Sequence, residues 1–346
     1  MTVITRRNAL LGAGSLLAAG CSSQKFTRLS LDSPEQFEMI SRASSYLHGP
    51  MPRDLCFLSM NGLHFLKHPQ WEREDVLANS PRPDGARGVF DGVDIDRTSG
   101  HIFFSDMGVM NQRDGAIYRC DRDGQTIRTV VEPGGSFTPK QLKIDQQSRK
   151  LYWSDREGMA VMRCNNDGSG VETLVRIGDP VENKGDQTRW CVGMALDPAR
   201  QQIYWSQKGG DNAGQGVIRR CGMELPEGET PDNRSDIETL FAGLPEPIDL
   251  DLDLEARMIY WTDRGDNTVS RAPMDLPPSP NPFARNDRDI LVTGLQEAIG
   301  IALLPSVKRM AFTSLGGEVG ISNMDGSDLT LLQQDVRPLT GIAWWA

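Results

Sequence analysis

A short strand with large aromatic residues recurs five times in this chain at nearly constant spacing. It reads IFFSD, LYWSD, IYWSQ, IYWTD and MAFTS, and its first rings lie at positions 103, 152, 204, 260 and 312. The units are therefore 49 to 56 residues apart, a period typical of the blades of a β-propeller. Because neighbouring residues on a strand point to opposite faces, the pair Tyr260–Trp261 needs apolar surroundings on both sides of its sheet. A blade packed between two other blades meets that need.

Three other segments recur in step with the aromatic strand. Upstream lie GVDID, QLKID, GMALD, DLDLD and GIALL, and downstream lie segments such as IYRCDRDG and VMRCNNDG, whose Asp-Gly pairs indicate tight turns. A short apolar run such as TLV or TLF closes each unit. The 35 glycines and 21 prolines agree with a turn-rich, all-β chain. Each unit is thus predicted to be a four-stranded blade.

The two ends of the repetitive region complement each other. LTGIAWW at 339–345 matches a first strand with nothing after it, whereas CFLS, GLHFL and DVLA at 56–78 match strands two to four. We therefore predict an all-β, six-bladed β-propeller over residues 54–346, with the sixth blade closed by both termini.

The recurring motifs resemble the YWTD repeats, the class B repeats of the low-density-lipoprotein receptor, over about 290 of the 346 residues. That resemblance implies a six-bladed propeller. Gln207 replaces the motif acid in one unit, and Ala311, Phe312 and Ser314 depart from the motif in the last. The animal proteins are receptor ectodomains flanked by EGF modules, which this sequence lacks, so their partners are not carried over.

The N-terminal residues are typical of an export signal. Arg6 and Arg7 precede an apolar run and then LAAGC, which resembles a bacterial lipoprotein box with Cys21 as the lipidated residue. We predict a twin-arginine signal over 1–20, then a tether with one short helix from Pro34 to about Leu47. The protein would then be exported to the periplasm and held on the membrane only through its lipid. A buried N-terminal helix is the alternative.

Charge and cysteine content narrow the class of partner. The net charge is −10, and it becomes −12 without residues 1–20, which contain only Arg6 and Arg7 as charged groups. Such a surface repels phosphate backbones, so nucleic acid is excluded as a partner. Five cysteines remain after Cys21 with no C-x-x-C pair, which indicates neither a zinc site nor a disulfide framework. We expect a monomer.

Familiar catalytic motifs are missing from the sequence. It has no G-x-S-x-G, H-E-x-x-H or Walker loop. Of its four histidines, His64 and His68 could share a strand face, but no third ligand is evident, and we expect both to be partly exposed. A Ser–His–Asp triad is not predicted. The motif acids Asp106, Asp155 and Asp263 recur from blade to blade, so we expect them to accept structural backbone hydrogen bonds.

The residues that break the repeat are the candidates for a functional site. In the first strand, where Gly92, Gly193 and Gly300 mark other blades, the chain places Gln141 and Asp249. Further polar or aromatic residues stand beside these strands and in the loops after the second strands, on the same face of the ring: Asp91, Lys140, Arg156, Trp190, Lys208, Glu246, Arg264 and Glu297.

These residues allow more than one chemistry at the channel mouth. Asp249, Glu297 and Gln141 could hold Ca²⁺ or another divalent cation, and Asp249 or Glu297 could then serve a hydrolase or lyase acting on a lactone or sugar acid. This reading resembles gluconolactonase-type propellers by location only. The residues also suit binding of a small polar ligand or a protein partner, with Trp190 packing on it. A solvated channel lined by ion pairs is the third reading.

Overall fold

The computed structural model describes residues 54–78, 81–82, 88–110, 112–278, 280–333 and 338–345. The chain divides into two compact units, 1–49 and 50–346, and all described residues belong to the second. The predicted signal, Cys21 and the predicted short helix lie outside the described residues. Within the described part, no helix has the length and apolar character that crossing a membrane requires.

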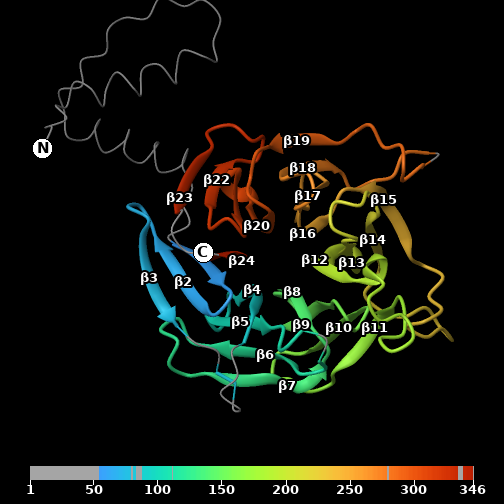
Figure 1. Ribbon diagram of the computed structural model, residues 1–346, viewed down its shortest axis with the longest axis horizontal. Helices are drawn as coiled ribbons and strands as arrows, with labels where there is room; N and C mark the ends of the chain where they lie inside the picture. The colour runs from blue at the N-terminus through green and yellow to red at the C-terminus, as the bar shows by residue number, and fades with distance from the viewer. Residues whose placement is uncertain are drawn as a thin grey trace, which may run out of the picture. The chain divides into compact units, whose positions relative to one another are not determined.

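Six four-stranded antiparallel sheets stand around one axis, as Figure 1 shows, and we number them as blades. Blades 1 to 3 comprise β4 (Phe90–Asp96), β5 (His101–Asp106), β6 (Gly115–Cys120) and β7 (Arg128–Ser136); β8 (Pro139–Ile144), β9 (Lys150–Asp155), β10 (Ala160–Asn165) and β11 (Glu172–Arg176); and β12 (Cys191–Asp197), β13 (Gln202–Gln207), β14 (Gly216–Gly222) and β15 (Glu238–Leu244).

The remaining three blades follow the same plan. Blades 4 to 6 comprise β16 (Pro247–Asp253), β17 (Met258–Asp263), β18 (Thr268–Pro273) and β19 (Asp289–Val292); β20 (Ala298–Leu304), β21 (Arg309–Ser314), β22 (Val319–Asn323) and β23 (Thr330–Gln333); and β24 (Leu339–Trp345), β1 (Asp54–Ser59), β2 (Gly62–Lys67) and β3 (Glu72–Leu77). Three single-turn 3₁₀ helices complete the described elements: η1 (Gln187–Arg189), η2 (Pro198–Arg200) and η3 (Pro305–Val307).

Blade 6 closes the ring with strands from both ends of the described chain. Its inner strand β24 pairs antiparallel with β1, so that Asp54 lies opposite Trp345 and Phe57 opposite Ile342. The predicted six-bladed propeller and its two-terminus blade are both confirmed.

Tyr260 and Trp261 occupy opposite faces of blade 4, as their alternation on β17 requires. Trp261 belongs to the apolar cluster shared with blade 3, together with Tyr204 and Phe241, and Tyr260 belongs to the cluster shared with blade 5, with Phe312. Both side chains are at most 2% exposed. The recurring aromatic pair therefore fills the two gaps on either side of a blade.

A hydroxyl group on the second strand joins each of the first five blades to the next one. Ser206, for example, accepts the backbone N–H of Gly193 at 2.8 Å and donates to the Ile248 carbonyl of blade 4 at 2.5 Å. We call this contact a hydroxyl bridge. The same donation to the next inner strand is made by Ser105, Ser154, Thr262 and Thr313. In blade 6 the bridge comes from the inner strand itself, since Thr340 donates to the Phe90 carbonyl at 3.0 Å.

The motif acids have the structural role that their recurrence predicts. Asp155 accepts the backbone N–H groups of Phe137, Thr138 and Gly158 at 2.7, 2.7 and 3.0 Å, which holds the segment entering β8 against the loop after β9. Asp263 likewise accepts the Glu246 N–H at 2.9 Å. Gln207 compensates for its missing charge by donating to the Thr188 carbonyl at 2.7 Å.

Deleting residues 339–346 should destabilise the whole propeller rather than one end. The deletion removes the buried side chains of Leu339, Ile342 and Trp344, at roughly 1.5–3 kcal/mol each, a loss comparable to the whole stability of a domain. It also exposes the edge of β1 that β24 covers. Urea titration of the truncated chain should show neither a native baseline nor a cooperative unfolding transition. An unchanged midpoint would contradict ring closure by β24.

Candidate functional site

The candidate site lies at the end of the central channel where the inner strands begin, which we call the entrance mouth. Two kinds of segment meet there: the loops that follow β9, β13 and β17, and the residues that lead into β12 and β16. Antiparallel pairing brings them together, because Pro247 at the start of β16 lies opposite Asp263 at the end of β17. Arg264 therefore follows directly beside Glu246, and its N–H donates to the Glu246 carbonyl at 3.0 Å.

Four charged side chains of blades 3 and 4 form one network, which we call the rim quartet. Lys208 Nζ and Arg264 Nη2 lie 2.7 and 2.6 Å from the same Glu246 oxygen, Oε1. Both also contact Asp211 Oδ1, at 3.0 and 2.9 Å. The Glu246 side chain is 2% exposed, whereas that of Asp211 is 76% exposed. The quartet thus has a buried acid beneath its two cations and a solvent-exposed acid above them.

Trp190 forms an aromatic wall beside the rim quartet. Its ring centroid lies 5.7 Å from Lys208 Nζ and 4.9 Å from the Arg156 guanidinium carbon, within the range of cation–π attraction. Arg156 is held by Glu157, at 2.5 and 2.9 Å. The indole Nε1 of Trp190 is buried without a hydrogen-bond partner in the described part of the chain. The wall therefore has one unused donor.

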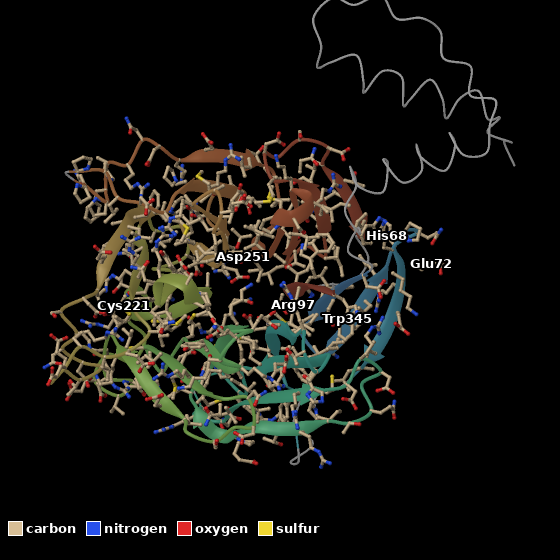
Figure 2. All side chains as sticks on the ribbon, turned by 180° about the vertical axis from the view of Figure 1, so that it is seen from behind. His68, Glu72, Arg97, Cys221, Asp251 and Trp345 are labelled. Carbon is tan, nitrogen blue, oxygen red and sulfur yellow. The ribbon has the colours of Figure 1, made fainter. Side chains whose placement is uncertain are left out.

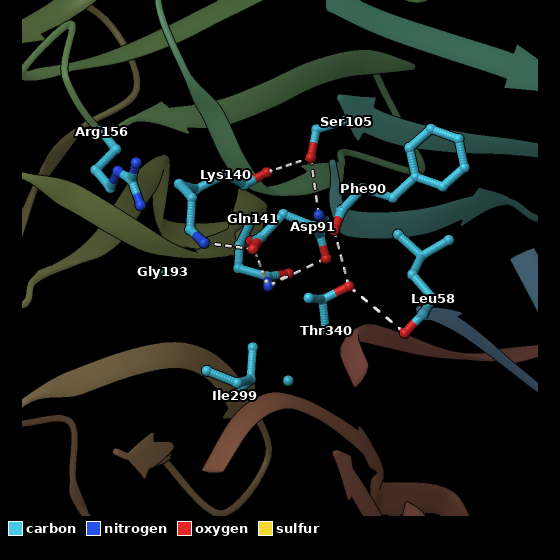
Figure 3. A network of polar contacts seen from close by, with 12 residues as sticks. Leu58, Phe90, Asp91, Ser105, Lys140, Gln141, Arg156, Gly193, Ile299 and Thr340 are labelled. Atoms are coloured by element: carbon cyan, nitrogen blue, oxygen red, sulfur yellow. Dashed lines mark hydrogen bonds and ion pairs between the residues drawn. The ribbon is translucent and has the colours of Figure 1, made fainter. Parts of the chain in front are cut away.

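A second polar group lies deeper in the channel, on blades 1 and 2 (Figure 3). Lys140 Nζ forms an ion pair with Asp91, and the Gln141 amide donates to the other Asp91 oxygen at 3.0 Å. Burial lowers the pKa of Lys140, and the Asp91 carboxylate opposes that shift. These three side chains satisfy one another, which leaves little for a ligand to displace.

Asp249 directs both carboxylate oxygens to backbone amides. Oδ1 accepts the Leu250 N–H at 2.8 Å, and Oδ2 accepts the Ile301 N–H of blade 5 at 3.1 Å. The side chain of Glu297 is exposed, and its backbone N–H donates to Asn267 at 2.8 Å. No hydrogen bond or ion pair joins Asp249, Glu297 and Gln141, and the described residues contain no group of three His, Cys, Asp or Glu side chains that could hold a metal. The metal-ligand set stays a prediction without support from these contacts.

The other end of the channel holds a pocket that the sequence reasoning missed. Its volume is about 370 Å³, and all six inner strands line it. Asp94, Lys143 and Asp251 point into it from positions where the other three blades have alanine, and Asp251 and Arg97 lie near the middle of the ring in Figure 2. Lys143 Nζ is 3.8 Å from Asp251 Oδ2, and the aspartates raise its pKa to about 12. The sequence contained a signal for this pocket, because three blades have a polar residue at a repeated position where the other three have alanine.

Taken together, the entrance mouth brings together Lys208, Glu246, Arg264, Trp190 and Arg156 from the predicted set. Asp91, Lys140 and Gln141 form a separate group below them, and Asp249 and Glu297 contact neither group. Two cations that share an exposed carboxylate beside an aromatic wall can bind an acidic group.

Comparison with known proteins gives relatives of the propeller. No family model matches the chain. The chain is 39% identical over 272 residues to "Low-density lipoprotein receptor-related protein 1" of Pyricularia oryzae, which covers 75% of this chain and 86% of that protein. It is 37% identical over 265 residues to "3-hydroxyacyl-CoA dehydrogenase-like protein LAM1" of Cochliobolus heterostrophus, which covers 73% of this chain. There the chain spans about half of the relative, 55% of its length.

Solved structures share the fold. A chain in the "Crystal structure of Nidogen/Laminin Complex" superposes with a TM-score of 0.61 at 18% identity, covering 84% of this chain and 97% of that one. TolB from Acinetobacter baumannii gives a TM-score of 0.59 at 13% identity, covering 88% of this chain and 69% of that one. At these identities the likeness extends to the fold alone.

Asp249→Asn should change how stability depends on pH. Burial raises the pKa of Asp249 from 3.8 to about 7, although Lys143 and the two amides oppose the shift. Between these values the native state keeps a proton that the unfolded chain has released, so the free energy of unfolding falls as pH rises. Asparagine removes this step. The free energy of unfolding of the variant minus that of the parent should therefore be larger at about pH 8 than at about pH 5.

Urea midpoints at the two pH values measure this difference. Leu250→Val, at the next position of the same strand, changes no ionisable group; it serves as the control and should leave the pH slope of the parent unchanged. An Asp249→Asn slope equal to that of the parent would show that Asp249 does not titrate in this range.

Proposed function

The chain belongs to the low-density lipoprotein receptor-related family of YWTD β-propellers, and on that premise we propose that it is a binding propeller that takes a carboxylate at its entrance mouth. The ligand is a small sugar-acid-like molecule or a protein partner that presents an acidic side chain. The observation that carries this proposal is the sharing of one exposed acid, Asp211, by two cations that a buried acid already holds in place.

An incoming carboxylate could replace either acid of the rim quartet, and Asp211 is the easier of the two to displace. Its side chain is 76% exposed, and exposed ion pairs contribute only about 0–1 kcal/mol. Glu246 is buried, and removing it would leave Lys208 and Arg264 with only the exposed Asp211 as a counter-charge; breaking a buried pair costs about 3–5 kcal/mol. An incoming carboxylate can therefore replace Asp211 while Glu246 keeps both cations oriented.

Trp190 supports the same mode of binding. Its ring centroid lies 5.7 Å from Lys208 Nζ, so the ring adds an apolar face beside that cation. An aromatic wall beside two cations suits the C–H face of a sugar acid or the stem of a glutamate side chain. The metal-dependent hydrolase or lyase is the second reading, and the contacts of Asp249, Glu297 and Gln141 do not favour it.

Opposite effects on affinity should follow from two substitutions in the rim quartet. Asp211→Ala frees both cations and should strengthen binding of the acidic ligand roughly fivefold, whereas Arg264→Met should weaken it by a similar factor, since each change is worth about 1 kcal/mol. Isothermal titration of the full chain with glucuronate and with a hexaglutamate peptide tests both sources of the carboxylate.

Arg271→Met is the matched control for that titration. Arg271 has a similar exposure to Arg264, 27% against 23%, and pairs with Asp289 on the outer strand of the same blade. It should leave both affinities unchanged. Binding of neither acid to the parent, or equal affinities in the parent and Asp211→Ala, would reject the proposed function.

We further propose that the propeller is exported and tethered to the membrane through Cys21. The proposal rests on Arg6, Arg7 and the LAAGC segment. Cys21→Ala should move the protein from the membrane fraction to the soluble periplasmic fraction, because the lipid attachment site is lost. Ser22→Ala, one residue away, should keep it in the membrane fraction. Equal membrane association of the two variants would count against the tether.

A further inference from the structure

Ser59 occupies the hydroxyl-bridge position of blade 6 but does not form the bridge. It lies two residues after Phe57 on β1, as Ser206 lies two residues after Tyr204 on β13. In blade 6 Thr340 takes over the contact with the next blade, by donating to the Phe90 carbonyl. The Ser59 hydroxyl is thereby released from the structural role that its counterparts have in the first five blades.

The released hydroxyl faces a histidine that an aspartate orients. Ser59 Oγ lies 2.9 Å from His64 Nε2, and His64 Nδ1 lies 2.7 Å from Asp75 Oδ1. A carboxylate accepts a proton, so Nδ1 carries one and Nε2 is the acceptor for the Ser59 hydroxyl. This is the geometry and the tautomer of a Ser–His–Asp triad. Its members lie on the three neighbouring strands β1, β2 and β3.

The surroundings hold the imidazole in this orientation. The Phe57 ring lies 5.1 Å from the His64 ring, and a Cβ on Gly62 would come within 2.7 Å of Nε2, so only glycine fits there. Arg73 fixes the other partner by donating to Asp75 at 2.6 Å. His64 is 5% exposed, so the expectation of a partly exposed residue was wrong. Burial also lowers its pKa, which favours the neutral form that a base requires.

We propose that Ser59 is a nucleophile that His64 activates and that it reacts with small acyl esters. Ser59 Oγ attacks the ester carbonyl carbon while its proton moves to His64 Nε2. The tetrahedral intermediate collapses by breaking the bond to the alcohol oxygen, which receives that proton. Water then attacks the acyl-Ser59 carbonyl while His64 Nε2 takes its proton; the bond to Ser59 Oγ breaks, Oγ receives that proton from His64, and the acid is released. Asp75 is a positioning residue, since it acts through His64.

The position of Ser59 limits the substrate to a small acyl group. Ser59 is 5% exposed and immediately precedes the exposed turn residues Met60 and Asn61. On this proposal, an acyl ester has to reach Oγ past this turn. Long acyl chains would have to displace the packed strands of blade 6.

Covalent labelling of the full-length chain tests the proposal. Diisopropyl fluorophosphate should add once, at Ser59, and p-nitrophenyl acetate should be hydrolysed. Ser59→Ala should abolish both reactions, and His64→Gln should slow them roughly 100-fold, the usual contribution of a general base. Peptide mapping should find no adduct at Ser105, Ser154 or Ser206, which have the same motif position but no histidine partner.

Asp75→Asn keeps the test valid if His64→Gln does not fold. The Asp75 side chain is 56% exposed, so its replacement should leave the unfolding midpoint near that of the parent. A positioning role predicts a lower kcat with KM unchanged, whereas a purely structural role would move neither. The proposal is overturned if the parent chain carries no adduct, if the adduct lies elsewhere, or if well-folded His64→Gln reacts as fast as the parent.

Discussion

The hydroxyl bridge is the contact on which the ring depends. The register of each inner strand shifts near its start, for example between Cys191 and Met194, and such a shift leaves backbone groups without a partner in their own sheet. Ser206 satisfies one of these, the Gly193 N–H, and donates its own proton to the carbonyl of Ile248 in the next blade. One side chain thus repairs the irregularity of its own blade and fixes the distance to the neighbour. Buried backbone groups without partners would otherwise be costly.

The sequence predicted the architecture well because repetition makes each packing requirement visible several times. Tyr260 and Trp261 alone are compatible with a core or a ligand platform, but five such strands in register require sheets buried on both faces. The same argument identified the motif acids as structural, and Asp155 shows the reason, with three backbone N–H groups on one carboxylate. The unmatched strands at the two ends predicted β24 in blade 6.

The candidate site was only partly predictable, because side-chain partners depend on register and on the neighbouring blade. Position along the chain placed Lys208, Glu246 and Arg264 on one face, and the structure joins them. The sequence could not show that the Asp249 carboxylate accepts the Ile301 N–H instead of facing the channel. That hydrogen bond depends on the register shift between Pro247 and Leu250. Likewise Ser59, His64 and Asp75 are spread over seventeen residues with no motif, and only the pairing of β1, β2 and β3 aligns them.

Departures from the repeat have different meanings according to whether another residue takes over the structural task. Gln207 replaces a motif acid but continues to tie its loop to the Thr188 carbonyl, so the departure is conservative. Ser59 keeps the motif residue yet loses the motif contact, because Thr340 supplies the bridge at the ring closure. A residue that keeps the motif type can therefore be available for a function, and a residue that departs from the motif can still have a structural role. The contact, and not the residue type, decides which positions of this propeller are available for function.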